Sequence, residues 1–367
     1  MPGMPTSSGS PWTVPSQWAD LMDAVQALRE IAFQLERAGA PSYRVRAFRR
    51  AAQVTRELPP AELAQRARAG TLRALPGIGA TTAEVITQAV AGQQPDYLAR
   101  VLDEAARSDR ASGAAGRVAG APGPAGLRAA LRGDCHTHSD CSDGGSPPWE
   151  MAETARDLGH EWIALTDHSP RLTVARGLSA EQLIEQFALI DRINAELAPF
   201  RLLTGIEVDI LEDGSLDQRP DLLARLDMVV ASVHSLLRMP AGPMTERMVT
   251  AVRNPHVDVL GHCTGRLLTG RGRPESVFDP EAVFTACRDH NVAVEINCRP
   301  ERQDPPDHLL TIAAELGCEF AIDTDAHAPG QLDWQASGCQ RAEAHGITAG
   351  RVINTRSVAG LRAGRTG

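Results

Sequence analysis

Histidines and carboxylates recur about every 30 residues over the last two thirds of the chain, each near the end of a short apolar stretch that predicts a buried strand. One strand, one helix and two loops use about 30 residues, so successive strands of a barrel would bring these side chains to one rim. The pattern therefore predicts a multinuclear metal site. Its members are His136, His138, Asp143, His168, Glu207, His234, His262, Asp325 and His327.

Strand-like and helix-like segments alternate from Arg132 onward, which is typical of an α/β fold with a parallel sheet. Seven strands with right-handed crossovers predict a (β/α) barrel that is one unit short of eight. The predicted strands cover residues 133–136, 162–166, 202–208, 228–233, 257–260, 292–296 and 320–323. Helical patterns lie between most of them, for example at 179–197, 280–290 and 306–316.

The front of the chain predicts a separate, small all-α unit. Apolar residues from Trp18 onward follow the spacing of an amphipathic helix, and a second helix carries arginines around its apolar stripe. Gly77 and Gly79 then allow a tight turn before a further helix, whose amides can hold a phosphate. An ordinary helical hairpin turn is the alternative. The arginines are Arg44, Arg46, Arg49 and Arg50.

Changes in composition divide the chain into four parts. The start is rich in Pro and Ser, and a later stretch of Ala, Gly and Pro has too little apolar surface to order itself. We therefore expect a disordered N-terminus over 1–15, an all-α domain over 16–107, a linker over 108–130 and the barrel domain over 131–362.

The 367 residues include no lysine, so all 37 basic side chains are arginine. This absence excludes Schiff-base catalysis and a Walker A phosphate loop, and it leaves arginine, backbone amides or metal to bind phosphate. The net charge of −9 argues against extensive coating by nucleic acid, and the acidic excess after residue 107 suits cation binding. Seven cysteines without a C-x-x-C pair, and no apolar run long enough for a membrane span or a signal peptide, predict a cytoplasmic protein.

The segment from Arg132 to about Ala344 resembles a PHP (polymerase and histidinol phosphatase) domain, through its H-x-H at 136–138, LTDHS at 165–169 and DTDAH at 323–327. The resemblance implies a distorted seven-unit barrel with three metal ions at its C-terminal rim. A suitable residue stands at all nine ligand positions of the family. The implied sets are His136, His138, Glu207 and Asp325 for one ion; Glu207, His234 and His262 for a second; and Asp143, His168 and His327 for a third.

Such a site predicts phosphoester hydrolysis, because close metal ions activate water and stabilise a leaving oxygen. Mixed imidazole and carboxylate ligands favour Zn, Mn or Fe. Glu207 and Asp325 are the predicted catalytic carboxylates, and Arg266 is the predicted grip on the substrate phosphate. Solvated loop charge is the alternative for three further arginines, which we expect to border the same rim. They are Arg176, Arg299 and Arg302.

Residues 18–98 resemble the N-terminal helix-hairpin-helix domain of bacterial family X DNA polymerases, whose members carry a PHP domain at their far end. The resemblance implies sequence-independent DNA contacts by the arginines of the second helix and by Gly77 and Gly79. The nucleotidyl-transfer core between the two domains is missing, so polymerase activity is not expected. Lyase activity is excluded because it requires a lysine.

The sequence is consistent with three functions. The first is a metal-dependent phosphoesterase that acts at DNA 3′ ends, as a 3′-5′ exonuclease or a 3′-phosphatase. The second is a phosphatase of small phosphomonoesters, such as histidinol phosphate or nucleotides. The third is a DNA-binding accessory protein whose barrel is structural. The sequence leaves the oligomeric state open.

Overall fold

The computed structural model describes residues 23–111 and 126–364. The chain divides into two compact units between residues 124 and 125. The predicted disorder of residues 1–15, and residues 112–125 of the predicted linker, lie outside the described part. At the linker's two ends the chain is helical, since α5 extends to Ala111 and α6 covers Leu127–Ala130.

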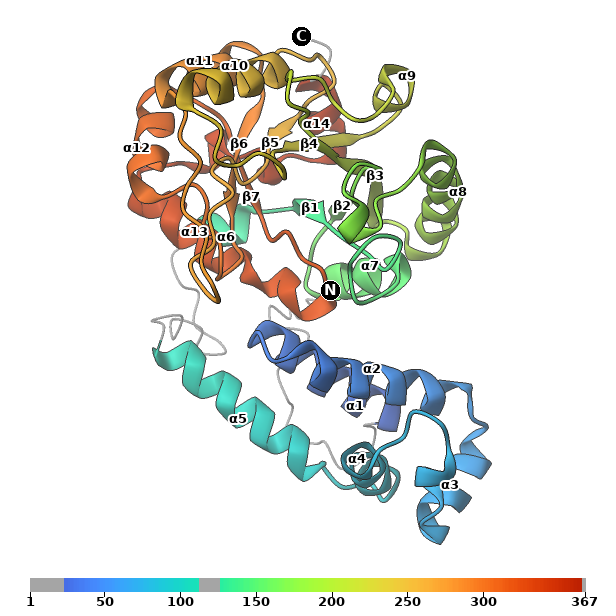
Figure 1. The fold of residues 1–367 in the computed structure, drawn as a ribbon. Helices are drawn as coiled ribbons and strands as arrows, with labels where there is room; N and C mark the ends of the chain where they lie inside the picture. Colours follow the sequence, from blue (N-terminus) through green and yellow to red (C-terminus); the bar gives the residue numbers. More distant parts are fainter. Residues whose placement is uncertain (1–22, 112–125, 365–367) are drawn as a thin grey trace, which may run out of the picture. The chain divides into compact units, whose positions relative to one another are not determined.

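The first unit is a set of helices around a small apolar core (Figure 1). Asp23 caps the first helix by accepting a hydrogen bond from the Val25 amide. Leu28, Ile31 and Ile86 are fully buried in the core, which follows from the three-and-four spacing of the apolar residues. The helices are α1 Ala24–Arg37, α2 Ser42–Glu57, α3 Pro60–Ala69, a 3-10 turn at Leu72–Ala74, α4 Ala80–Val90 and α5 Asp96–Ala111.

The second unit is a parallel seven-stranded barrel with helices outside it, which confirms the predicted fold class (Figure 1). Consecutive strands are neighbours throughout. Because the strands are largely buried on both faces, most of their sequences are predominantly apolar. The strands are β1 Gly133–Thr137, β2 Trp162–Leu165, β3 Arg201–Asp209, β4 Met228–Ser232, β5 Val259–Leu260, β6 Ala293–Asn297 and β7 Phe320–Asp323.

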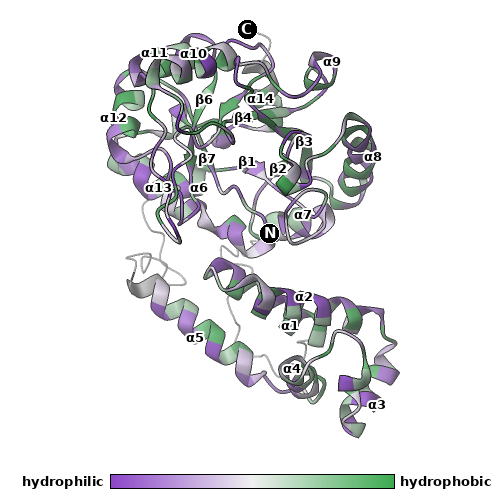
Figure 2. Ribbon diagram, in the orientation of Figure 1, coloured by the Kyte–Doolittle hydropathy of each residue, from purple (hydrophilic) through white to green (hydrophobic). Residues whose placement is uncertain are grey.

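Helices follow most of the strands and cover the barrel. Figure 2 shows hydrophobic residues along most of the strands and both hydrophobic and hydrophilic residues on the covering helices. Within the described residues, no helix has both the length and the hydropathy that a membrane crossing requires. The helices are α6 Leu127–Ala130, α7 Pro148–Asp157, α8 Ala180–Leu197, α9 Pro220–Leu223, α10 Ala241–Val252, α11 Pro280–Asp289, α12 Asp307–Glu315, α13 Gln335–Ala344 and α14 Val358–Gly364, with 3-10 turns at Thr173–Ala175, Pro329–Trp334, Ala349–Arg351 and Ile353–Thr355.

Strands β1 and β7 meet through one backbone bridge, between Thr137 and Ala326, and through buried side chains. The Asp323 carboxylate accepts hydrogen bonds from the Cys135 amide at 2.9 Å and from the Asn354 side chain at 2.9 Å. Side-chain hydrogen bonds thus supplement the short backbone pairing between β1 and β7, and the barrel is distorted at this junction. This junction places the ends of β1 and β7, with their predicted ligands, side by side.

His160, between α7 and β2, gives the second unit a predictable sensitivity to acid. Burial, aided by the nearby charge of Arg128, lowers its pKa to about 3 from the usual 6.5. The unfolded chain therefore takes up the proton first as the pH falls, and stability is lost below about pH 6.5. Between about pH 7 and pH 4, His160→Leu is expected to lose about 3 kcal/mol less unfolding free energy than the wild type. Chemical denaturation at both pH values measures the difference. An identical pH dependence in the wild type and in His160→Leu would contradict a lowered pKa of His160 in the folded protein.

Candidate metal centre

The nine predicted ligands gather at the carboxyl ends of the barrel strands. His136 and Glu207 lie within β1 and β3, and the others lie in the loops that follow a strand. His138, Asp143 and His168 belong to the loops after β1 and β2. The loops after β4, β5 and β7 hold the remaining four, which are His234, His262, Asp325 and His327.

Glu207 is the centre of this cluster. Its side chain is 1 % exposed, and its two carboxylate oxygens lie within 3.6 Å of imidazole nitrogens from five histidines. Neither oxygen has a hydrogen-bond partner among the described residues. Buried carboxylate oxygens normally have donors, so this arrangement fits a cation between the carboxylate and the rings. The histidines are His136 at 3.3 Å, His138 at 3.6 Å, His168 at 2.8 Å, His234 at 3.2 Å and His262 at 2.9 Å.

The ligand atoms form three overlapping groups that could hold a metal ion, each with its atoms within 4.8 Å of one another. Asp325 adds an oxygen that lies 3.4 Å from Nε2 of His138 and 3.9 Å from Nε2 of His136. The structure thus brings all nine residues together, while the division among individual ions stays a prediction. The groups are His138, Asp143, His168 and His327; His136, His138 and Glu207; and His168, Glu207 and His234.

The charges of the cluster also suit cation binding. Burial works to raise the pKa of Glu207, but the charges of His136 and His234 outweigh it and hold the pKa well below its usual range. For Asp325, Arg299 and the histidines likewise overcome burial and keep the pKa low. Burial, with the charges of neighbouring histidines, holds the pKa of His138 well below 6.5. The site therefore offers ionised carboxylates together with a neutral imidazole.

Arg266, the predicted phosphate grip, is committed to other partners. Its guanidinium donates hydrogen bonds to the carbonyl of Arg302 at 2.9 Å and to the carbonyl of Gln303, and it pairs with Glu275 at 3.2 Å. Arg266 therefore connects the loop after β5 to the loop after β6. This placement differs from the expected role because the partners lie about 36 residues further along the chain, beyond the reach of a local motif.

Arg299 and Arg302 come much closer to the predicted ligands. Nη1 of Arg299 lies 3.0 Å from Nδ1 of His327, and Nε of Arg302 lies 3.3 Å from Oδ2 of Asp325. Nε and Nη1 of Arg302 are buried and make no hydrogen bond. Arg176 is exposed after β2, and its charge opposes the burial that raises the pKa of Asp140.

Two residues of β6 that the sequence reasoning missed lie directly behind the cluster. Glu295 and Asn297 are fully buried, and each makes hydrogen bonds to predicted ligands or to each other. A charged residue inside the apolar stretch 292–296 was the available signal, since Glu207 stands out in its strand in the same way. Asp209, 3.4 Å from Nδ1 of His234, was also missed.

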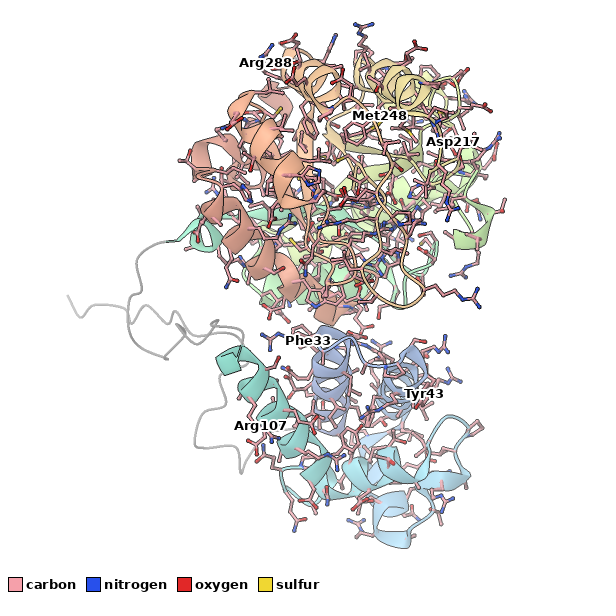
Figure 3. All side chains as sticks on the ribbon, turned by 60° about the vertical axis from the view of Figure 1, so that its left-hand side comes forward. Phe33, Tyr43, Arg107, Asp217, Met248 and Arg288 are labelled. Carbon is pink, nitrogen blue, oxygen red and sulfur yellow. The ribbon has the colours of Figure 1, made fainter. Side chains whose placement is uncertain are left out.

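The helical unit keeps three of its four candidate arginines at the surface. Arg44, Arg46 and Arg50 are exposed on α2, as is Tyr43, which projects from the unit in Figure 3. Arg49 differs, because its guanidinium pairs with the buried carboxylate of Glu36 at 2.6 Å. We therefore assign Arg49 a structural contact between α2 and α1.

Gly77 and Gly79 form the tight turn expected before α4. Gly77 has a φ of 97°, which favours glycine, and a Cβ there would lie 2.8 Å from the side chain of Arg50. Thr82 accepts a hydrogen bond from the Gly79 amide at 2.9 Å. The side chain of Arg50 on α2 thus packs directly against the turn.

Comparison with known proteins agrees with these two units. Residues 22–94 match the family model of a helix-hairpin-helix domain, and residues 134–299 match that of the PHP domain. The second unit is a PHP domain. The predicted resemblance is confirmed for both units.

Two curated relatives share the PHP domain. The DNA polymerase/3'-5' exonuclease PolX of Bacillus subtilis (strain 168) is 41% identical over 233 residues, which are 64% of this chain and 40% of that protein. The present chain thus spans less than half of that relative's length. A protein of Thermoanaerobacter sp. (strain X514) named "Probable phosphatase" is 29% identical over 233 residues, which are 60% of this chain and 89% of that protein.

A solved structure is also similar to part of this chain. It is the histidinol phosphate phosphatase of Lactococcus lactis subsp. lactis, which aligns with a TM-score of 0.44 and 20% identity over 60% of this chain and 94% of that chain.

Proposed function

We propose that this protein is a metal-dependent phosphoesterase whose PHP domain hydrolyses phosphoester bonds. The observation that carries the proposal is Glu207, a buried carboxylate without hydrogen bonds that is surrounded by imidazole nitrogens. A purely structural carboxylate would have donors in that place. Divalent ions held about 3.5 to 4 Å apart lower the pKa of a bound water and stabilise the leaving oxygen of a phosphoester.

We propose three divalent ions, held by the nine clustered residues in the sets that the family resemblance implies. Glu207 would be shared by two of the ions and Asp325 would hold one of them. Zn, Mn and Fe suit a mixture of imidazoles and carboxylates. All seven cysteines are free thiols and six are buried, which supports a further proposal that the protein works in the reducing cytoplasm.

Arg302 is our choice for the residue that binds the substrate phosphate, with Arg299 beside it. Its Nε lies 3.3 Å from Asp325 and makes no hydrogen bond, and neither does Nη1, whereas the guanidinium of Arg266 donates to two backbone carbonyls. A guanidinium can bind two phosphate oxygens at once and stabilise charge as the phosphoester bond breaks. Arg176 is exposed in the loop after β2, and we propose it as a further phosphate contact.

We propose DNA 3′ ends as the substrate, cleaved as a 3′-5′ exonuclease or a 3′-phosphatase. The helix-hairpin-helix unit supports this choice, because Arg44, Arg46, Gly77 and Gly79 are all exposed and could contact phosphates. The exonuclease named in the Bacillus relative supports it as well. The second candidate is a phosphatase of small phosphomonoesters, which the likeness to a probable phosphatase favours.

The two candidates differ in what the helical unit contributes. In an Arg44→Ala, Arg46→Ala double variant, kcat/KM for a 3′-phosphorylated oligonucleotide is expected to fall about tenfold, and the salt dependence of log KM to lose a slope of about 1.4, since each lost contact with single-stranded DNA removes about 0.7. Turnover of a small ester should not change. Arg68→Ala, Arg107→Ala removes the same charge from exposed positions elsewhere on the unit and serves as the control.

His136→Ala should abolish turnover of both substrates. If the double variant and its control treat the oligonucleotide alike, the DNA contact is refuted and the small-ester phosphatase is favoured. If the wild type turns over neither substrate in Mn or Zn, the protein is an accessory DNA-binding protein with a structural barrel.

A further inference from the structure

We propose that Glu295 is the positioning residue of the metal centre, because it fixes the ring of His136 and ties ligands from three strands into one set. The inference rests on the proposed metal site but concerns a residue outside the nine ligands. Glu295 lies in β6, the one strand that contributes none of those nine side chains directly or through the loop after it. Its role would give β6 a place in the site.

The first contact sets the orientation of His136. Oε1 of Glu295 lies 2.6 Å from Nδ1 of His136, and both side chains are fully buried. We assign the hydrogen of this bond to Nδ1 of His136, with the carboxylate oxygen of Glu295 as the acceptor. Nε2 then presents its lone pair toward Glu207, whose Oε2 lies 3.3 Å away. Imidazoles that bind metals are held in this way by carboxylates behind them.

The second oxygen reaches two further ligands. Oε2 of Glu295 accepts hydrogen bonds from the backbone amide of His262 and from the side chain of Asn297, at 3.2 Å in the second case. The same Asn297 amide nitrogen donates to Oδ2 of Asp325 at 3.1 Å. One carboxylate therefore connects a ring on β1, the backbone after β5 and, through Asn297, a carboxylate after β7.

These contacts separate Glu295 from the proposed ligands. Both of its oxygens have partners, whereas neither oxygen of Glu207 has one. A carboxylate whose oxygens are occupied by donors has little capacity left for a cation. Glu295 thus stands behind His136 and supports it, while Glu207 faces the ion.

The test is the isosteric substitution Glu295→Gln. A glutamine side chain has one acceptor oxygen, so it can accept either from the His136 ring or from the amides of His262 and Asn297. Its NH₂ group then faces the other donor without an acceptor for it. We expect the affinity for one Zn ion per chain to fall about 10- to 100-fold, measured by competition with a chromophoric chelator on the full chain. The ion proposed for Asp143, His168 and His327, none of which bonds to Glu295, should remain bound with its original affinity.

Asp227→Asn is the matched control. That carboxylate also accepts hydrogen bonds from a backbone amide and a hydroxyl, both of Thr204, at 3.2 and 3.1 Å, but it precedes β4 at the opposite end of the barrel. The zinc affinity of the Asp227→Asn variant should equal that of the wild type. A general loss of stability would affect both variants, whereas a positioning role affects only Glu295→Gln.

Two further measurements test the proposal even if Glu295→Gln does not fold. Asn297→Ala keeps the contact between Glu295 and His136 but removes the link to Asp325, and it should weaken one zinc site less than tenfold. In ¹⁵N-histidine spectra of the zinc-loaded wild type, His136 should carry its proton on Nδ1. Protonation at Nε2, or unchanged zinc affinity in Glu295→Gln, would overturn the proposal. A wild type that binds no zinc would instead refute the proposed function itself.

Discussion

Glu207→Gln is expected to lower kcat/KM for phosphoester hydrolysis by at least about 10³-fold, because it removes the carboxylate that five imidazoles surround. A neutral amide offers one oxygen in place of two ionised ones and cannot be shared by two cations. The bound metal per chain should fall with the activity. The fold should persist, since the Glu207 oxygens make no hydrogen bond that glutamine would lose.

Steady-state kinetics and elemental analysis of the purified full chain measure these two effects. Glu212→Gln is the control, because this exposed carboxylate lies five residues further along the same segment. Its activity and metal content should match those of the wild type. A Glu207→Gln protein that keeps its metal and its activity would show that the cluster is not the catalytic site.

The barrel could be predicted closely because its strands are buried on both faces. Most of these strands are apolar runs with polar residues at or just after their ends, so the sequence marks both the strand and its end. The prediction of 320–323 agrees with β7, and that of 228–233 differs from β4 by one residue. Strand β5 is the weakest match: 257–260 was expected, but only Val259–Leu260 pair as a strand.

The predicted ligands could be found because each depends on one local relation, a histidine or carboxylate at a strand end. The supporting residues could not, since their partners lie far away in sequence. Glu295 meets His136 across 159 residues, and Arg266 meets the 302–303 backbone across 36 and 37. Only the closed barrel brings these segments together. In the helical unit, Arg49 was also misjudged, because its pairing with the buried carboxylate of Glu36 depends on the packing of α2 against α1.

The roles of the rim arginines are where the structure most changes the sequence-based expectation. The loop after β6 is held against the loop after β5 by buried Asp304, which accepts hydrogen bonds from the amide of Thr264 at 3.2 Å and from its hydroxyl at 2.6 Å. Arg266 adds to the same contact by donating to the carbonyls of Arg302 and Gln303. Arg266 therefore supports the loop that places Arg302 beside Asp325.

Arg302→Met is accordingly expected to reduce kcat/KM by about 10²- to 10³-fold while leaving the metal content unchanged, since it removes charged donors for the substrate phosphate and spares every proposed ligand. Arg302→Lys restores the charge but only a single-point contact, so its kcat/KM should fall between those of Arg302→Met and the wild type. Arg271→Met, an exposed arginine of the neighbouring rim loop, should resemble the wild type.

Comparison with Arg266→Met decides between the two arginines. Loss of Arg266 loosens the contact between the rim loops, so it should lower thermal stability and reduce kcat/KM less than Arg302→Met does. The reverse order, with a stable Arg266→Met protein and the larger catalytic loss at Arg266, would contradict the assignment of Arg302. It would mean that substrate draws Arg266 away from two backbone carbonyls and Glu275, contacts that a bound phosphate would then have to replace.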